Sequence, residues 1–215
     1  MLPACQQFNP ARQGSIHAPI RKTIICIDSR VRTKRNPNSL EEQEERGIEM
    51  MKSTDYSPEE DSARAVISGL IDEWNMEPHP EGGWYREVHR SHETVTRTDG
   101  AQRSGLTTIL FLLEAGSISR WHQVHHADEV WIHLQGAPLS LWQLPESGGT
   151  AQQHVLSFQK PVHVIPANHW QAAKPEGPYC LVSCCVGPGF DFADFTMLST
   201  LSAETRPHGA LPELI

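Results

Sequence analysis

A histidine and a glutamate separated by six residues are the strongest candidates for chemistry in this chain. His122 and Glu129 fall in two successive predicted strands, residues 117–124 and 129–134. Because side chains alternate along a strand, Trp131 and His133 share the face of Glu129. A His on one strand and a carboxylate on the next can converge on one small volume, where they could bind a metal or act as acid and base.

The spacing around this pair resembles the first motif of the cupins, small β-barrels with a polar pocket. Five residues lie between Gly116 and His122, and six lie between Glu129 and Gly136. Residues 166–171 resemble the second cupin motif. The resemblance implies four metal-ligand positions, which hold His122, Val124, Glu129 and Gln171.

This set of residues leaves two hypotheses for the pocket. Val cannot coordinate a metal, Gln is a weak neutral ligand, and a tight transition-metal site usually has three His or carboxylate ligands. One hypothesis is a divalent metal on His122, Glu129 and Gln171. The other is a pocket in which the His and Glu bond each other or a ligand.

A series of short predicted strands fills the rest of the chain and predicts an all-β sandwich or barrel. Asp99-Gly100 is a strong hairpin turn signal. The predicted strands cover residues 82–90, 94–98, 106–113, 117–124, 129–134, 139–144, 153–158, 162–165, 169–173 and 179–186.

Helices are predicted only at the two ends of this region. Ser57-Pro58-Glu59-Glu60 has the residues of a helix start. Residues 63–74 then carry an apolar stripe that would pack on a sheet. Residues 194–203 are a second, short candidate. We therefore predict a domain over residues 57–205, a tail over 206–215 and a disordered or loosely attached extension over 1–56.

Charge and composition exclude several classes of protein. The net charge of −8 argues against nucleic-acid binding. No apolar run approaches the length that spans a bilayer. The odd number of Cys favours free thiols in a reducing compartment, and hence the cytoplasm. Residues 1–35 are basic, with seven Lys/Arg against one Asp, so organelle targeting is an alternative.

Three further segments identify the family more closely. They are HPEGGWYRE at 79–87, DEVW at 128–131 and PGFDFADF at 188–195. Together they resemble the cupin-5 family, also called DUF985, over about residues 63–195. The resemblance implies a cupin jelly-roll β-barrel and a homodimer, without an established reaction. Structural relatives of the family include sugar-nucleotide epimerases, although fold analogy is a weak guide to function.

These observations favour a barrel that binds a small polar metabolite, such as a sugar derivative. In one hypothesis it is an isomerase or epimerase. In another it is a non-catalytic binding protein, and in a third the charged N-terminal segment mediates interactions. The candidate catalytic residues are His122, Glu129 and Tyr85. The candidate ligand-binding residues are Trp131, His133, His169, Gln171 and Glu87.

Overall fold

A computed structural model of the protein describes residues 58–215. The predictions for residues 1–56 therefore lie outside the described residues. The elements are α2 (Pro58–Trp74), β1 (Glu77–Pro78), β2 (Trp84–Arg90), β3 (Thr94–Thr96), β4 (Gln102–Ser104), β5 (Thr107–Glu114), β6 (Ser119–Val124), β7 (Asp128–Gly136), β8 (Leu139–Leu144), β9 (Gln152–Leu156), β10 (Val162–Ile165), β11 (Trp170–Pro175), β12 (Tyr179–Gly187), η1 (Phe192–Asp194), β13 (Phe195–Met197), η2 (Leu198–Thr200), η3 (Ala203–Thr205) and η4 (Pro212–Leu214).

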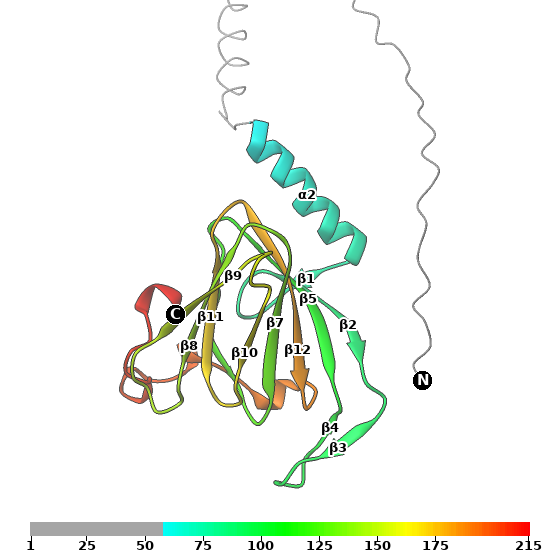
Figure 1. Ribbon diagram of the computed structural model, residues 1–215. Helices are drawn as coiled ribbons and strands as arrows, with labels where there is room; N and C mark the ends of the chain where they lie inside the picture. The colour runs from blue at the N-terminus through cyan, green and yellow to red at the C-terminus, as the bar shows by residue number, and fades with distance from the viewer. Residues whose placement is uncertain (1–57) are drawn as a thin grey trace, which may run out of the picture. The chain divides into compact units, whose positions relative to one another are not determined.

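Two sheets form the body of the fold (Figure 1). The first has six strands in the order β1-β2-β5-β12-β7-β10, and the second has five in the order β13-β6-β11-β8-β9. Strands β3 and β4 form a separate hairpin, which turns at Asp99-Gly100 as predicted. Among the described strands no ladder joins the two large sheets, so the predicted all-β jelly roll is confirmed as an open sandwich.

Alternating side chains of the two sheets meet in the interior. Trp131 is fully buried there, and Phe111 packs edge-to-face against it with ring centroids 5.9 Å apart. Leu139 and Leu141 of β8 close the core from the second sheet. Burial of a large apolar side chain contributes about 1.5–3 kcal/mol, so this cluster holds the sheets together.

Helix α2 begins at Pro58, as the sequence predicts, and covers part of the first sheet. Its Ile67 packs with Leu112 and Leu181. Trp74, the last residue of the predicted apolar stripe, is instead 42% exposed. The stripe is therefore buried only in its middle turns.

The chain end covers the outer face of the second sheet. Leu198 and Leu214 pack with Trp121, whose indole N–H donates to the carbonyl of Leu211 at 3.1 Å. Residues 206–215, predicted as a tail, thus belong to the packed domain. The predicted helix over 194–203 is wrong, because Phe195–Met197 pair with β6 and leave only short 3-10 turns on either side.

Candidate functional site

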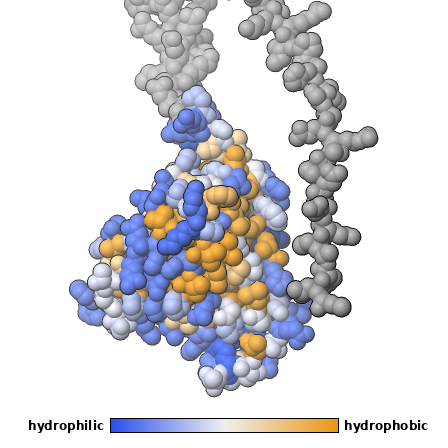
Figure 2. Space-filling view, viewed as in Figure 1, coloured by the Kyte–Doolittle hydropathy of each residue, from blue (hydrophilic) through white to orange (hydrophobic). Residues whose placement is uncertain are grey.

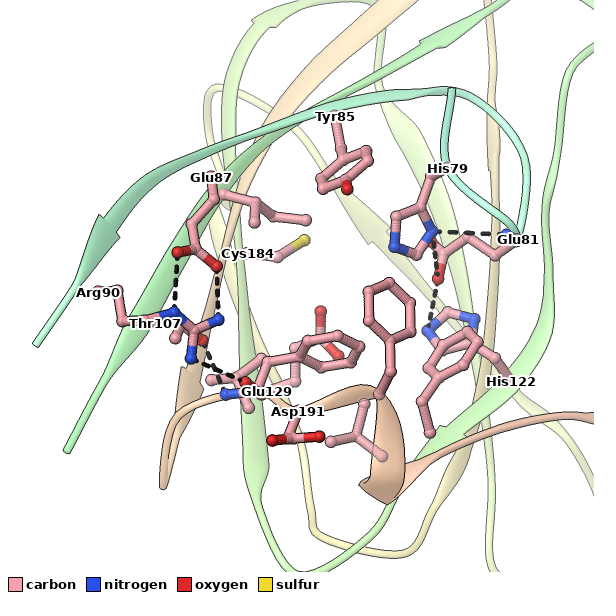
Figure 3. A pocket seen from close by; sticks show the side chains of 16 residues that line it. His79, Glu81, Tyr85, Glu87, Arg90, Thr107, His122, Glu129, Cys184 and Asp191 are labelled. Atoms are coloured by element: carbon pink, nitrogen blue, oxygen red, sulfur yellow. Dashed lines mark hydrogen bonds and ion pairs between the residues drawn. The ribbon is translucent and has the colours of Figure 1, made fainter. Parts of the chain in front are cut away.

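A cavity of about 350 Å³ opens at the end of the sandwich where β5 and β7 begin and β6 and β12 end. Its volume falls in the range of small-molecule sites. Figure 3 shows two polar groups on opposite sides of it, one around Glu81 and one around Glu87. The lining residues are His79, Glu81, Tyr85, Glu87, Arg90, Thr107, Ile109, His122, Val124, Glu129, Cys184, Val186, Phe190, Asp191, Phe192 and Phe195.

The turn before β2 directs Glu81 inward. Gly82 has a φ of +115°, and a Cβ there would lie 2.1 Å from the carbonyl oxygen of Ile118. Only Gly permits this close approach between the turn and β6. The Arg120 N–H donates to the Glu81 carbonyl at 2.9 Å, and the Ser119 hydroxyl donates to Glu81 Oε1 at 2.8 Å. Two contacts to β6 therefore fix the Glu81 side chain, which is 5% exposed.

Glu81 meets two imidazoles in this position. Its Oε2 lies 3.2 Å from His122 Nε2 and 3.4 Å from His79 Nδ1. The other nitrogen of His122, Nδ1, lies 2.8 Å from the carbonyl of Arg120, which can only accept, so Nδ1 carries a proton. The contact from His122 Nε2 to Glu81 is then a hydrogen bond only while the two residues share one further proton.

Burial shifts the pKa values of Glu81 and His122 toward each other. Burial raises the pKa of Glu81 to about 6, although the charge of His79 and the hydrogen bond from Ser119 oppose the shift. Burial lowers the pKa of His122, against the charge of Glu129 and the hydrogen bond to Arg120. A group that loses its proton near the working pH is suited to general acid–base catalysis.

Glu129 reaches the same cavity from β7. It is 6% exposed, and its Oε2 accepts a 2.6 Å hydrogen bond from the Gln171 amide. The Gln171 oxygen accepts in turn from the Trp131 indole at 2.8 Å. Burial raises the pKa of Glu129, and the charge of Glu81 adds to this effect while His122 and Gln171 oppose it. Gln171 and Trp131 therefore orient the carboxylate from behind.

The other side of the cavity is a charged pair at its mouth. Arg90 donates from Nε and Nη2 to the two carboxylate oxygens of Glu87, at 2.9 and 2.6 Å, and from Nη1 to the carbonyl of Phe190 at 3.1 Å. A β-bulge between Glu87 and His89 brings Arg90 to this place. The guanidinium is thus occupied by partners within the protein.

Three phenylalanines from the segment after β12 wall the cavity. Phe190, Phe192 and Phe195 have ring centroids 5.0 to 6.0 Å apart, and Phe195 lies 5.4 Å from the His122 ring. They line the pocket at one end of the sandwich.

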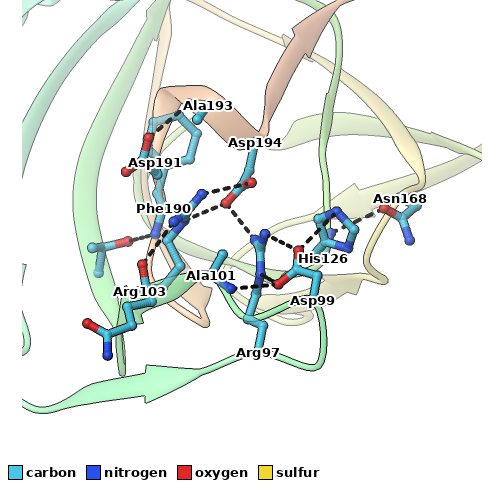
Figure 4. Close-up of polar contacts among 12 residues, drawn as sticks. Arg97, Asp99, Ala101, Arg103, His126, Asn168, Phe190, Asp191, Ala193 and Asp194 are labelled. Carbon is cyan, nitrogen blue, oxygen red and sulfur yellow. Dashed lines mark hydrogen bonds and ion pairs between the residues drawn. The ribbon is translucent and has the colours of Figure 1, made fainter.

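Asp194 ties this wall to the β3–β4 hairpin (Figure 4). Its Oδ2 accepts from Arg97 Nη1 and Arg103 Nε, both at 2.7 Å, and its Oδ1 accepts from Arg103 Nη2 at 3.0 Å. Asp191 caps the short turn by accepting from the Ala193 N–H at 2.9 Å. Asp194 therefore joins the cavity wall to the hairpin, and Asp191 stabilises the turn that precedes Asp194.

The structure brings four of the predicted site residues together in the cavity, His122, Glu129, Tyr85 and Glu87. It places four others outside the lining. Trp131 lies in the core, and Gln171 lies behind Glu129. His133 bonds the carbonyl of Ala137, and His169 bonds the amide of Gln143.

Six lining residues with polar side chains were absent from the prediction, namely His79, Glu81, Arg90, Thr107, Cys184 and Asp191. Tyr85 and Glu87 share one face of β2, but Glu81 and His79 lie in and before the turn that precedes this strand, where alternation does not predict the direction of a side chain. Arg90 gave no signal either, since the bulge breaks the alternation. His125 and His126 do not line the cavity, and they contact Thr196 and Asn168 instead.

The predicted metal set does not fit the geometry. Gln171 has both ends of its amide engaged, one with Glu129 and one with Trp131, and Val124 occupies the fourth position. Within residues 58–215, no group of three or more His, Cys, Asp or Glu is arranged to hold a metal ion. We therefore derive no step through a metal.

A change at Glu81 should alter how stability depends on pH. The folded pKa of about 6 lies above the ordinary value of 4.5, so Glu81 stabilises the fold below pH 4.5 and loses this contribution as the pH rises to about 6. The loss is about 2 kcal/mol. The measurement is urea unfolding of both proteins at each pH. Between pH 4 and pH 7, the free energy of unfolding of Glu81→Gln should rise by that amount relative to that of the natural protein. The exposed control Glu87→Gln should show no such gain. If the free energies of unfolding of Glu81→Gln and the natural protein change in parallel with pH, the raised pKa of Glu81 is contradicted.

The two-sheet jelly roll with a polar cavity at one end defines a cupin. The chain belongs to the DUF985 family of the cupin superfamily, and the match to this family covers residues 68–198. It is similar to a hypothetical protein from Leishmania major, at 29% identity and a TM-score of 0.56 over 60% of this chain and 85% of that one. Protein SO0799 from Shewanella oneidensis is 28% identical, with a TM-score of 0.55 over 60% and 82% of the chains. No curated protein matches the sequence.

Among the described residues, no helix has the length and apolar character to cross a membrane.

Proposed function

We propose that the cavity binds a small polar metabolite and transfers protons on it, as an isomerase or epimerase does. Glu81 and His122 act as one acid–base pair, and Glu129 and Tyr85 face the same space. The observation that carries the proposal is the 3.2 Å contact between Glu81 and His122 inside a cavity, where burial raises the pKa of Glu81 to about 6. Such a pair can remove a proton from a carbon next to a carbonyl and return it.

Solvent deuterium tests this function. The purified protein is incubated in D₂O with a panel of reducing sugars, keto sugars and hydroxyketones, and proton NMR follows the C–H signals next to each carbonyl. A proton-transferring enzyme exchanges deuterium into one of these positions. A protein that binds a member of the panel, as seen by saturation transfer, and exchanges none is a binding protein.

That non-catalytic alternative has one observation in its favour. Glu129 is bonded to Gln171, and His122 is bonded to the carbonyl of Arg120, so both polar groups have partners within the protein. Buried polar groups that are satisfied in this way persist without any turnover. Detection of exchange would decide against this alternative.

We also propose that the protein is a homodimer that joins through the outer face of the first sheet. Figure 2 shows an apolar patch over this sheet. Val162 and Val164 of β10 are 48% and 45% exposed, and they pair with Ile132 and Val130 of β7. Leu134, at 47% exposure, continues the patch. These five positions carry no charge, so the face can pack against a second copy of itself about a two-fold axis.

Charge placed on this face should separate the protomers. Two ammonium groups in each protomer would meet their own copies across the axis in a region without counter-ions, where like charges cost several kcal/mol. Val162→Lys with Val164→Lys should therefore shift the mass measured by light scattering from dimer to monomer. The control is Val95→Lys on the β3–β4 hairpin, also exposed. A natural protein that is monomeric at micromolar concentration would rule out the dimer.

A further inference from the structure

The cavity holds more acidic groups than basic ones. Four lining residues carry carboxylates, Glu81, Glu87, Glu129 and Asp191, and one lining residue, Arg90, has a permanent positive charge. Glu87 binds that guanidinium through both of its oxygens. The two lining His residues are biased toward their neutral forms, since burial lowers the pKa of both. The other three carboxyl groups share no printed hydrogen bond with this guanidinium, although the charge of Asp191 attracts it.

Two of these groups are also buried. Glu81 and Glu129 are 5% and 6% exposed. Their negative charges repel one another, and the charge of Glu81 therefore raises the pKa of Glu129. An ionised carboxylate away from water is strongly destabilising unless an opposite charge compensates it. A positively charged ligand would supply that charge.

Aromatic rings complete the surroundings. The Tyr85 and His79 rings pack edge-to-face with their centroids 4.8 Å apart. The three Phe rings of residues 190–195 form the adjoining wall. Aromatic faces attract cations, and a group of rings beside carboxylates is a common way to hold an organic ammonium. A phosphate has the opposite requirement, because it needs Arg or Lys donors. The one Arg in the lining is already engaged by Glu87 and Phe190.

We infer that the cavity selects a small organic cation, an amine or quaternary ammonium compound, in preference to a neutral or phosphorylated analogue. This inference rests on the proposed function only in that the same cavity receives the ligand. It names the class of molecule that the pair Glu81 and His122 would act upon.

Calorimetry at pH 7 with matched probes tests the inference. The first pair is choline and its neutral isostere 3,3-dimethylbutan-1-ol, and the second pair is glucosamine and glucose 6-phosphate. We expect the cation of each pair to bind at least roughly tenfold more tightly. Glu129→Gln should remove most of this preference. The control Glu114→Gln, which lies outside the cavity and accepts from the Trp84 indole, should retain it.

Several outcomes would overturn the inference. They are equal or tighter binding of the neutral isostere or the phosphate, binding of Mn²⁺ or Zn²⁺ that displaces choline, and absence of cation binding at millimolar concentration. The same experiments distinguish a failure of cation selection from a failure of the proposed catalysis. If choline binds and no compound exchanges deuterium, catalysis fails and cation selection stands. If a neutral sugar binds and exchanges, selection fails and catalysis stands.

Discussion

Replacement of His122 by Asn is expected to lower the rate of deuterium exchange by about 10²–10⁴-fold, the usual contribution of a positioned acid or base. Asn can still donate to the carbonyl of Arg120, so the local fold is retained. It cannot take up the proton that His122 Nε2 shares with Glu81 across 3.2 Å. The measurement is the initial exchange rate by NMR on whichever member of the panel exchanges.

The matched control is His169→Asn. His169 lies outside the cavity and bonds the side chain of Gln143, so its loss should leave the exchange rate within a few-fold. Thermal unfolding of both variants checks that they remain folded. A folded His122→Asn protein with an unchanged rate would remove His122 from the mechanism and leave Glu81 and Glu129 as the remaining acid–base groups.

Asp194→Ala should cost about 3 kcal/mol of unfolding free energy at pH 7, because it leaves the Arg103 guanidinium without a carboxylate and the Arg97 guanidinium with Asp99 alone. Arg97 and Arg103 both bind this carboxylate, whose side chain is 11% exposed. Burial alone would raise the pKa of Asp194, but the hydrogen bonds from Arg103 and Arg97 hold it below its ordinary value. The measurement is urea unfolding of the variant beside the natural protein.

The pH dependence gives this prediction a second readout. A lowered folded pKa means that Asp194 stabilises the protein above its unfolded pKa, and that the contribution is lost as the pH falls through the folded pKa. The deficit of Asp194→Ala should therefore shrink in acid. The control Glu87→Ala removes an exposed pair, which is worth at most about 1 kcal/mol. Equal losses in the two variants would contradict a special role for Asp194.

The sequence was sufficient to predict most of the fold. Strands 139–144 and 162–165 have the predicted bounds. A Pro lies directly before and directly after each of them, and Pro cannot donate to a sheet ladder. Strand β2 begins two residues later than predicted, since Gly82 and Gly83 belong to the turn. The C-terminal segment was mispredicted, because its pairing with β6 depends on a partner some seventy residues away.

The pocket was only partly predictable for a related reason. Alternation along β7 correctly put Trp131 on the inner face with Glu129. It could not say how deep in the sandwich each residue lies. The cavity occupies one end, so Glu129 at the start of the strand faces it, while Trp131 two residues on is packed in the core. Position along the strand becomes known only when both sheets are assembled.

The aromatic wall has a consequence for how this pocket could change. Its three Phe rings come from one stretch of chain, residues 190–195, whereas Glu81, His122 and Glu129 come from three separate elements. A substitution of Phe190 or Phe192 alters the shape of the cavity, whereas a substitution of Phe195 also alters the packing on the His122 ring. The shape of the cavity and its proposed acid–base groups are therefore encoded by separate segments, and an exchange of residues 190–192 should change the first while leaving the second in place.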